Sequence, residues 1–224
     1  MKKNKNILVF SPHPDDECLG LGGSLAKFVN QQYNIKVCFI SGHLPPLYKR
    51  SQFEKTKAEA ISAMHLIGIN KFSFLELPAT KINEIPICEL NNLLDREIIE
   101  FKPEMVFIPF PDRHIDHKKI FEACMVVSRP IARYNFIKLL VAYETLSETH
   151  WNAVNIEPSF KPNWFIDITH QIEIKIKALR CYKSQINKNY YSRSLEAVKS
   201  LANFRGSQNG FKYAEAFQII RKIT

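Results

Sequence analysis

Short apolar runs alternate with longer segments of helical spacing along the first two thirds of the chain. The apolar runs are rich in β-branched and aromatic residues, which is typical of buried strands. Strands are therefore predicted at residues 7–10, 35–41, 72–77, 105–109 and 139–143. Helices are predicted between them, within residues 25–29, 51–67, 86–101 and 121–127. This alternation with short links predicts an α/β fold, with a Rossmann-like, mostly parallel sheet flanked by helices.

After Glu144 the pattern becomes mixed. A short strand is predicted at residues 164–168, followed by helices at 172–182, 192–204 and 213–223. No internal repeat or low-complexity linker divides the chain. We therefore expect a single domain over residues 1–224, with a Rossmann-like core at 1–144 and a smaller mixed C-terminal portion at 145–224.

Composition narrows the class of protein. Of the 224 residues 46% are hydrophobic, yet no apolar run approaches the ~18 residues of a membrane span, so no membrane anchor is expected. The basic segment Met1–Lys5 precedes an apolar run too short for a signal peptide. The five cysteines show no C-x-x-C pairing, which favours free thiols in a reducing compartment. A cytoplasmic protein is expected.

The positive charge is concentrated at the C-terminal end. From residue 161 onward the chain has 12 Lys or Arg against 4 Asp or Glu, which is +8 of the total of +9. No RNA-recognition, zinc-finger or Lys/Arg-run signature accompanies this charge, so nucleic acid is not the expected partner. An anionic small molecule is the favoured interpretation, and a solvated basic helix face is the alternative. The candidate cations are Arg180, Lys183, Arg193, Arg205 and Lys212.

The first strand runs directly into His13-Pro14-Asp15-Asp16-Glu17. Adjacent carboxylates repel one another, and they are stable together where they are solvated or face a cation. A solvated acidic turn is the simplest explanation of such a segment. Here, however, a histidine precedes the acids, and the segment lies at the carboxyl end of a strand, where open α/β sheets place ligands. We therefore interpret it as part of a functional site.

A second polar segment, His114-Ile115-Asp116-His117, follows the fourth strand. In the common strand order 3-2-1-4-5, strands one and four are neighbours, so the two polar segments would face each other across the crevice. Either segment alone is a weak signal. Together they offer histidines and carboxylates, and two histidines with one carboxylate and an open fourth position form a catalytic zinc site.

These two segments resemble the motifs of the PIG-L/LmbE-like superfamily of zinc-dependent N-deacetylases. Further similar segments lie at residues 143–147, 162–168, 177–185, 205–206 and 214–217, so the resemblance spans essentially the whole chain. It implies that His13, Asp16 and His117 bind one Zn²⁺. Iron(II) or Mn²⁺ is also compatible with a site of two histidines and one aspartate.

The resemblance further implies the roles of the remaining polar residues. Asp15 matches the general base that deprotonates the metal-activated water. His114 matches the residue that stabilises the oxyanion and protonates the leaving amine, and Asp116 matches the partner that orients His114. Because a neighbouring carboxylate raises a histidine pKa, His114 is expected to act in its protonated form.

The substrate contacts of the family carry over to this chain only in part. Many family members carry an arginine on the second helix where this chain has Thr56. The residues that we predict to contact substrate instead are Arg50, Lys57, Tyr143, Arg193 and Arg205.

The resemblance implies an acetylated amino-sugar conjugate as substrate, with the sugar of the N-acetylglucosamine type linked to a nucleotide, a lipid or another glycoside. A homo-oligomer is compatible with the sequence. The alternative function is a non-catalytic sugar- or nucleotide-binding protein on the same scaffold. A dinucleotide-binding module is disfavoured because Gly20-Leu21-Gly22-Gly23 is not G-x-G-x-x-G.

Overall fold

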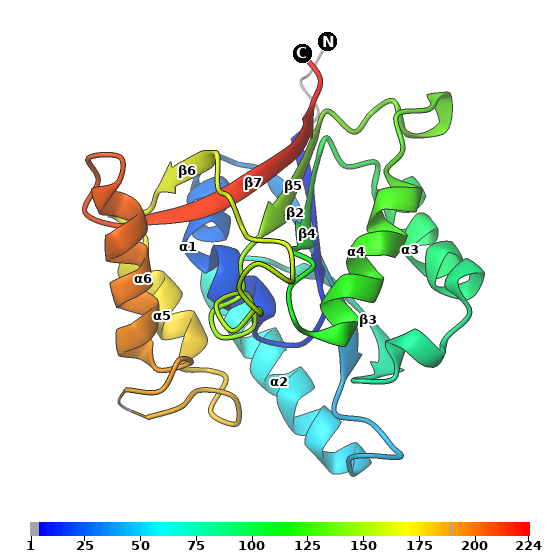
Figure 1. Cartoon of the computed structure of the whole chain (residues 1–224), viewed down its shortest axis with the longest axis horizontal. Coiled ribbons are helices and arrows are strands. Elements are labelled where there is room, and N and C mark those ends of the chain that lie inside the picture. The colour runs from blue at the N-terminus through cyan, green and yellow to red at the C-terminus, as the bar shows by residue number, and fades with distance from the viewer. Residues whose placement is uncertain (1–4, 189) are drawn as a thin grey trace.

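The computed structural model describes residues 5–188 and 190–224. Residues 1–4, which belong to the basic segment considered for a signal peptide, lie outside the described residues. Seven strands form one sheet in the order β3-β2-β1-β4-β5-β7-β6 (Figure 1). They are β1 (Asn6–Ser11), β2 (Asn34–Gly42), β3 (Lys71–Pro78), β4 (Met105–Pro109), β5 (Leu139–Tyr143), β6 (Trp164–Asp167) and β7 (Ala214–Lys222).

The first five strands are parallel, and their order 3-2-1-4-5 is the one expected from the sequence. The pairing of β1 with β4 places Leu8 opposite Val106 and Val9 opposite Phe107. The carboxyl ends of β1 and β4 are therefore adjacent, as the two polar segments require. The prediction of a Rossmann-like α/β fold is confirmed.

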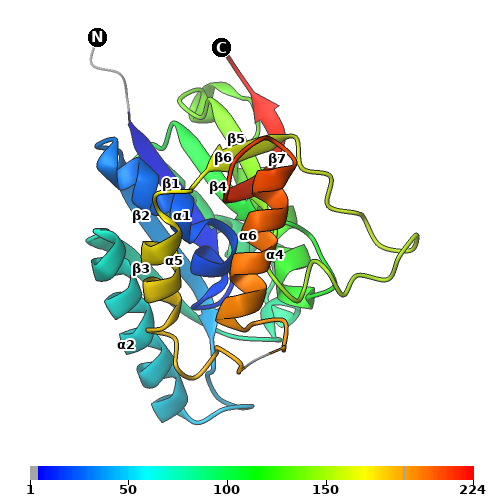
Figure 2. The ribbon, with the colours of Figure 1, turned by 90° about the vertical axis from the view of Figure 1, so that its left-hand side faces the viewer.

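Helices cover both faces of the sheet. In Figure 1, α3 and α4 lie on one side of the strands and α1, α5 and α6 on the other, and Figure 2 shows α5 alongside α1 and α2. Among the described residues no helix combines the length and apolar character needed to cross a membrane. The helices are α1 (Asp16–Asn30), α2 (Arg50–Ile67), α3 (Ile87–Phe101), α4 (Ile115–Val127), α5 (Ile172–Leu179) and α6 (Leu195–Ser207), with short 3₁₀ turns at Ile82–Glu84 and Ala132–Tyr134.

The alternation of side chains along β1 builds two cores. Ile7 and Val9 point to one face, where they join apolar residues of α1, α2 and α5. Leu8 and Phe10 point to the other face and pack with residues of α3 and α4. All four side chains are completely buried, so both faces of β1 are covered, as is typical of a central parallel strand. This double packing fixes the position at which the polar segment after β1 begins.

The predicted helix at residues 213–223 is wrong, because this segment forms β7. It lies antiparallel between β5 and β6, with Phe217 opposite both Tyr143 and Trp164. Its first four residues, 214–217, are all buried, and an apolar run of this length does not distinguish a strand from a buried helix. Pairing with two neighbours decides the conformation. The C-terminal portion thus extends the same sheet as the core.

Helix α1 begins at Asp16, well before the predicted start at residue 25, and it is kinked at Leu21. The second half of the helix begins near Gly23, whose N–H donates to the Glu215 carboxylate at 2.9 Å. Buried Lys175 pairs with the same carboxylate. Gly20 lies against Tyr143, where a Cβ would approach ring atom Cδ2 to 2.4 Å. A glycine is therefore required for this close approach, which seats the start of α1 beside β5.

Candidate metal and active site

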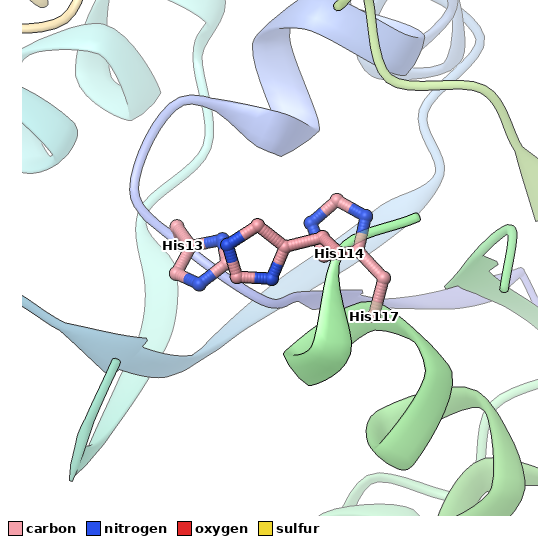
Figure 3. A group of neighbouring side chains, drawn as sticks. All are labelled: His13, His114 and His117. Atoms are coloured by element: carbon pink, nitrogen blue, oxygen red, sulfur yellow. The ribbon is translucent and has the colours of Figure 1, made fainter. Parts of the chain in front are cut away.

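The two polar segments meet at the carboxyl edge of the sheet. His13 lies in the loop between β1 and α1, and His117 lies in the first turn of α4. Figure 3 shows the imidazole rings of His13, His114 and His117 gathered in one place, although His13 follows β1 and the other two follow β4. The ring centroids of His13 and His117 are 5.4 Å apart, and those of His13 and His114 are 4.6 Å apart. The expectation that the segments face each other is met.

The side chains predicted to bind metal converge on one carboxylate oxygen. Asp16 Oδ2 lies 3.0 Å from His13 Nδ1 and 3.2 Å from His117 Nε2. Ligand atoms bound tetrahedrally at ~2.0–2.1 Å are roughly 3.4 Å apart, so these separations suit a shared small cation. The other oxygen, Asp16 Oδ1, is buried without a hydrogen-bond partner among the described residues, and a cation would compensate its charge. The three residues therefore fit a divalent metal.

A second donor set overlaps the first. His13, His114 and His117 can each offer one nitrogen, and these three atoms lie within 4.8 Å of one another. His114 Nδ1, however, already accepts a hydrogen bond from the backbone N–H of Asp116 at 3.2 Å. Asp16 Oδ2 lies within 3.2 Å of a nitrogen of both His13 and His117, so the two donor sets share these two histidines and differ in the third ligand.

A buried carboxylate that sequence reasoning missed supports His117 from behind. His117 Nδ1 lies 3.0 Å from Asp112 Oδ1. Asp112 also accepts hydrogen bonds from the Thr149 hydroxyl at 2.9 Å and from the backbone N–H of His114 at 3.0 Å. Such an arrangement fixes which ring nitrogen of a histidine faces a metal. The position of Asp112 in the loop before His114 was the only signal in the sequence.

The carboxylate of Asp116 contacts His13 more closely than His114. Its Oδ2 lies 2.9 Å from His13 Nε2 and 4.0 Å from His114 Nδ1. The same oxygen accepts a hydrogen bond from the N–H of Thr80 at 2.7 Å. Thr80 has a φ of +65°, which is strained for a β-branched residue. His114 is thus oriented by the backbone N–H of Asp116, whereas the carboxylate of Asp116 is directed to His13.

The candidate base, Asp15, is 1% exposed and has a φ of +130°, an unusual conformation for an aspartate. Arg193 donates to Asp15 Oδ2 at 3.2 Å and also lies 3.5 Å from the Glu148 carboxylate. The N–H of Asp15 donates to Glu17 at 3.1 Å, and the Tyr182 hydroxyl donates to the same carboxylate. The side chain of Asp15 is therefore held by Arg193, and its backbone N–H is held by Glu17.

Burial and charge set the protonation of these groups. Burial raises the pKa of Asp15 to about 8, against the opposing charge of Arg193. Although burial opposes the shift, His117 and His13 hold the pKa of the Asp16 carboxyl well below its usual range. Burial also works against the charged form of His13, yet Asp116 and Asp16 raise its pKa to about 9. The cluster thus holds an ionised Asp16 carboxylate beside protonated imidazoles, which a cation would deprotonate on binding.

The pKa of His114 departs from its ordinary value in the direction opposite to the one expected from Asp116. Burial, followed by the charges of His13 and His117, lowers the pKa of His114 to about 4. Asp116 raises it only weakly, because its carboxylate lies 4.0 Å away. His114 is therefore neutral near pH 7. Since Nδ1 accepts a hydrogen bond, Nε2 is the nitrogen that carries the proton.

A cavity of about 120 Å³ opens beside these residues. His13, Asp15 and His114 are part of its lining. Of the residues predicted to contact substrate, only Arg193 is part of its lining. The lining also includes residues that sequence reasoning missed, among them His43, Tyr48, Thr80, Glu148 and Gln185.

The remaining predicted substrate contacts have other partners. Arg50 and Lys57 both pair with Glu76, at 2.6 and 2.9 Å. Tyr143 is completely buried, and its hydroxyl donates to the carbonyl oxygen of Phe10 at 2.8 Å, so it supports β1 and does not face the cavity. Arg205 forms a paired contact with a buried glutamate, Glu144. These four residues have other contacts and do not line the cavity, and a contact with substrate stays a prediction for them.

Comparison with known proteins adds the family. Residues 8–128 match the family model PIG-L, GlcNAc-PI de-N-acetylase. The chain belongs to the PIG-L family. Membership in this family supports a deacetylase, which is a hydrolase. The diacetylchitobiose deacetylase of Thermococcus kodakarensis is 26% identical over 239 residues, which cover 98% of this chain and 84% of the relative.

Solved structures agree on the fold. The N,N'-diacetylchitobiose deacetylase of Pyrococcus horikoshii has a TM-score of 0.77 at 22% identity, covering 97% of this chain and 84% of the other. The 4-carboxy-2-hydroxymuconate hydratase GalB of Pseudomonas putida has a TM-score of 0.78 at 18% identity, covering 98% of both chains. One of these proteins is named as a deacetylase and the other as a hydratase. The shared fold therefore does not by itself define the reaction.

Proposed function

We propose that this protein is a metal-dependent hydrolase that removes the N-acetyl group from an N-acetylglucosamine-type sugar in a nucleotide-, lipid- or glycoside-linked conjugate. The observation that carries the proposal is the buried Asp15 carboxylate in a cavity directly beside the donor atoms of His13, Asp16 and His117. The family and the diacetylchitobiose deacetylases among its relatives support both the amide bond and the sugar type.

His13, Asp16 and His117 would hold the divalent metal, with Zn²⁺ as the expected ion and Fe²⁺ or Mn²⁺ as alternatives. When bound, such a cation supplies Lewis-acid chemistry that polarises an amide carbonyl and makes a water acidic near neutral pH. Asp112 keeps Nε2 of His117 directed to the site by contacting Nδ1 at 3.0 Å. Asp116 holds His13 from the other side at 2.9 Å.

Asp15 takes the proton of the attacking water. Its carboxylate is buried and fixed by Arg193, so it is positioned without reorganisation when the water attacks the acetyl carbon. The Nε2–H of His114 donates a hydrogen bond to the acetyl oxygen as negative charge develops there. When the carbon–nitrogen bond breaks, the proton held by Asp15 passes to the leaving amine, which gives acetate and the free amino sugar.

The role of His114 changes from the one that the sequence implied. An imidazole with a pKa of about 4 is a poor proton source for an amine at neutral pH, but its neutral N–H is a good hydrogen-bond donor. Asp15, with a pKa raised to about 8, is better matched to accept a proton and return it. The proposal therefore assigns the proton transfer to Asp15 and the oxyanion contact to His114.

A non-catalytic sugar-binding protein is the alternative, because it would use the same cavity without turnover. Metal analysis of the purified protein combined with acetate release from a panel of N-acetylated sugars separates the two. Release of stoichiometric acetate and amine by the metal-loaded protein supports the hydrolase. Sugar binding without acetate release from any member of the panel supports the alternative.

A further inference from the structure

The cavity has two sides that differ in their hydrogen bonding. On the reactive side, His13, Asp15 and Arg193 hydrogen-bond with one another or with buried carboxylates, and His114 accepts a backbone N–H through Nδ1, which leaves its Nε2 for the reacting group. A second group of lining residues, which we call the recognition side, consists of His43, Tyr48 and Thr80. Among the described residues, none of these three side chains has a hydrogen-bond or ion-pair partner.

The recognition side comes from a different part of the sheet. His43 and Tyr48 lie between β2 and α2, and Thr80 follows β3. The reactive residues instead follow β1 and β4. Because the strand order is β3-β2-β1-β4, the cavity extends along the sheet edge from the reactive residues toward the ends of β2 and β3. A bound molecule with its amide at Asp15 would therefore place its remaining groups over His43 and Tyr48.

The two aromatic residues are held in place by their own packing. The rings of His43 and Tyr48 are 4.6 Å apart at an interplanar angle of 77°, an edge-to-face arrangement. The segment is anchored where it leaves β2, because a Cβ on Gly42 would approach the ring of buried Phe53 to 2.6 Å. The polar atoms of the recognition side are thus positioned before any ligand binds.

The chemistry of the recognition side matches hydroxyl groups. A neutral imidazole offers one donor and one acceptor, and a phenol and a threonine hydroxyl each offer both. Neighbouring hydroxyls of a pyranose ring also donate and accept, so they satisfy such groups in pairs. Glu148 and Arg193, which also line the cavity, lie 3.5 Å apart and pair with each other, so their charges do not select for a charged ligand group.

We propose that His43, Tyr48 and Thr80 determine sugar specificity, with the ring hydroxyls of the acetylated pyranose hydrogen-bonded to His43 and Tyr48. This inference rests on the proposed deacetylase function and names the part of the cavity that recognises its sugar. It also fixes the orientation of the bound sugar. The acetamide lies at Asp15, and the hydroxyl-bearing edge of the ring lies toward the ends of β2 and β3.

The test uses methyl N-acetylglucosaminide and its singly deoxygenated derivatives as probes with the metal-loaded protein. The variants are His43→Ala and Tyr48→Phe, the second of which keeps the ring packing and removes only the hydroxyl. His65→Ala, an exposed histidine on α2, is the matched control. Thermal unfolding verifies that each variant is folded, and kcat and KM are measured for every pair of protein and probe.

For the parent sugar, we expect kcat/KM of His43→Ala to fall about 10-fold or more, mainly through KM, with His65→Ala unchanged. One deoxygenated sugar should be a poor substrate for the wild type, and His43→Ala should lose nothing further with it, because the same hydrogen bond is already absent. Tyr48→Phe should show the same behaviour with a neighbouring hydroxyl.

The outcomes separate this inference from the proposed function. Acetate release by the wild type, with His43→Ala and Tyr48→Phe still discriminating the deoxygenated sugars as sharply as the wild type, would overturn the recognition side alone. If the wild type releases no acetate, the proposed function fails. Saturation-transfer NMR of the same sugars then tests whether the recognition side binds sugar. The proposal requires that the wild type binds the sugars and that His43→Ala does not.

Discussion

Arg193 and Asp15 are 178 positions apart in the sequence, yet the guanidinium Nη1 of Arg193 donates to Asp15 Oδ2 at 3.2 Å. Arg193 also donates to the Ser147 hydroxyl at 3.1 Å and lies 3.5 Å from Glu148. A single side chain therefore connects the candidate base to the loop after β5. The contact gives Arg193 two possible functions, positioning the base or binding an anionic substrate, and these have different kinetic consequences.

Replacing Arg193 with alanine should lower kcat for a neutral acetylated sugar by about 10-fold or more, with metal content unchanged, because the base loses its fixed partner. Arg193→Lys should recover part of the rate through the retained charge. Steady-state kinetics on the neutral sugar measures the effect. A loss confined to KM for charged sugars would instead identify Arg193 as an anion-binding residue.

Asp15→Asn should keep the metal and lose activity. The amide preserves the volume of the side chain but cannot accept the proton of water, and removal of a general base costs roughly 10²–10⁴-fold in kcat. Metal content and acetate release are measured on the same sample. Asp95→Asn, which removes a carboxylate paired with Arg133 outside the cavity, is the control. Near wild-type turnover by Asp15→Asn would direct the search for the base to Glu17.

Asp16→Ala and His117→Ala should each lose the bound metal, whereas His114→Ala should retain it and lose activity. The expectation follows from the 3.0 and 3.2 Å separations of Asp16 Oδ2 from the two histidine nitrogens. Elemental analysis after dialysis measures the stoichiometry. If His114→Ala loses the metal and Asp16→Ala does not, the three-histidine set is the correct one.

The buried Glu144 should make stability depend on pH in the acid range. Although burial opposes the shift, His150 and Arg205 lower the pKa of Glu144, so its contribution is present above the ordinary value of 4.5 and is lost as the pH falls through the lower folded pKa. We expect Glu144→Gln to be less stable at pH 7, by about 1–3 kcal/mol, and the difference to shrink toward pH 3.

Urea unfolding between these two pH values measures the effect. Glu173→Gln removes a carboxylate from an exposed pair with Lys199 and should change stability by less than about 0.5 kcal/mol throughout. A constant difference between Glu144→Gln and the wild type at every pH would show that the ionisation of Glu144 does not stabilise the fold.

The expected anionic substrate remains a prediction, and the structure narrows the cations that could serve it. Arg205 is paired with Glu144, but Arg180, Lys183 and Lys188 line an open groove and have no acidic partner among the described residues. The kcat/KM of a phosphate-bearing acetylamino sugar should therefore fall as salt shortens the Debye length from ~10 Å at ~0.1 M, while that of a neutral sugar should not.

The double variant Arg180→Gln, Lys183→Gln should remove this salt dependence, and Lys71→Gln on β3 is a control for a distant charge. Equal salt responses for the charged and the neutral sugar would show that the basic groove is a solvated surface that does not bind substrate.

The sequence was sufficient to predict the core and the meeting of the two polar segments, because both follow from the order of the strands. Apolar runs marked the parallel strands, and polar residues directly after β1 and β4 had to meet once these strands were neighbours. Local information also limits the prediction. The last apolar run was assigned to a helix, since periodicity over a few residues does not show whether two strands lie beside it.

Residues that reach the cavity from distant loops could not be predicted in the same way. His43 and Glu148 carry no motif, and only the folded chain brings them to Asp15. The reverse also holds. Tyr143 and Arg205 belong to segments that resemble the family, but their contacts with Phe10 and Glu144 serve the fold. Similarity of a segment therefore does not show whether a residue contacts substrate.

The position of β7 has a consequence for the order in which the molecule folds. In the described sheet, β6 pairs only with β7, so β6 cannot join the sheet until the segment Ala214–Lys222 has been synthesised and has paired with β5. Glu215 on the same strand accepts the N–H groups of Gly23 and Ser24 in α1. The helix that begins at Asp16 thus reaches its final form last, and a ribosome-bound chain lacking β7 should not yet bind metal with native affinity.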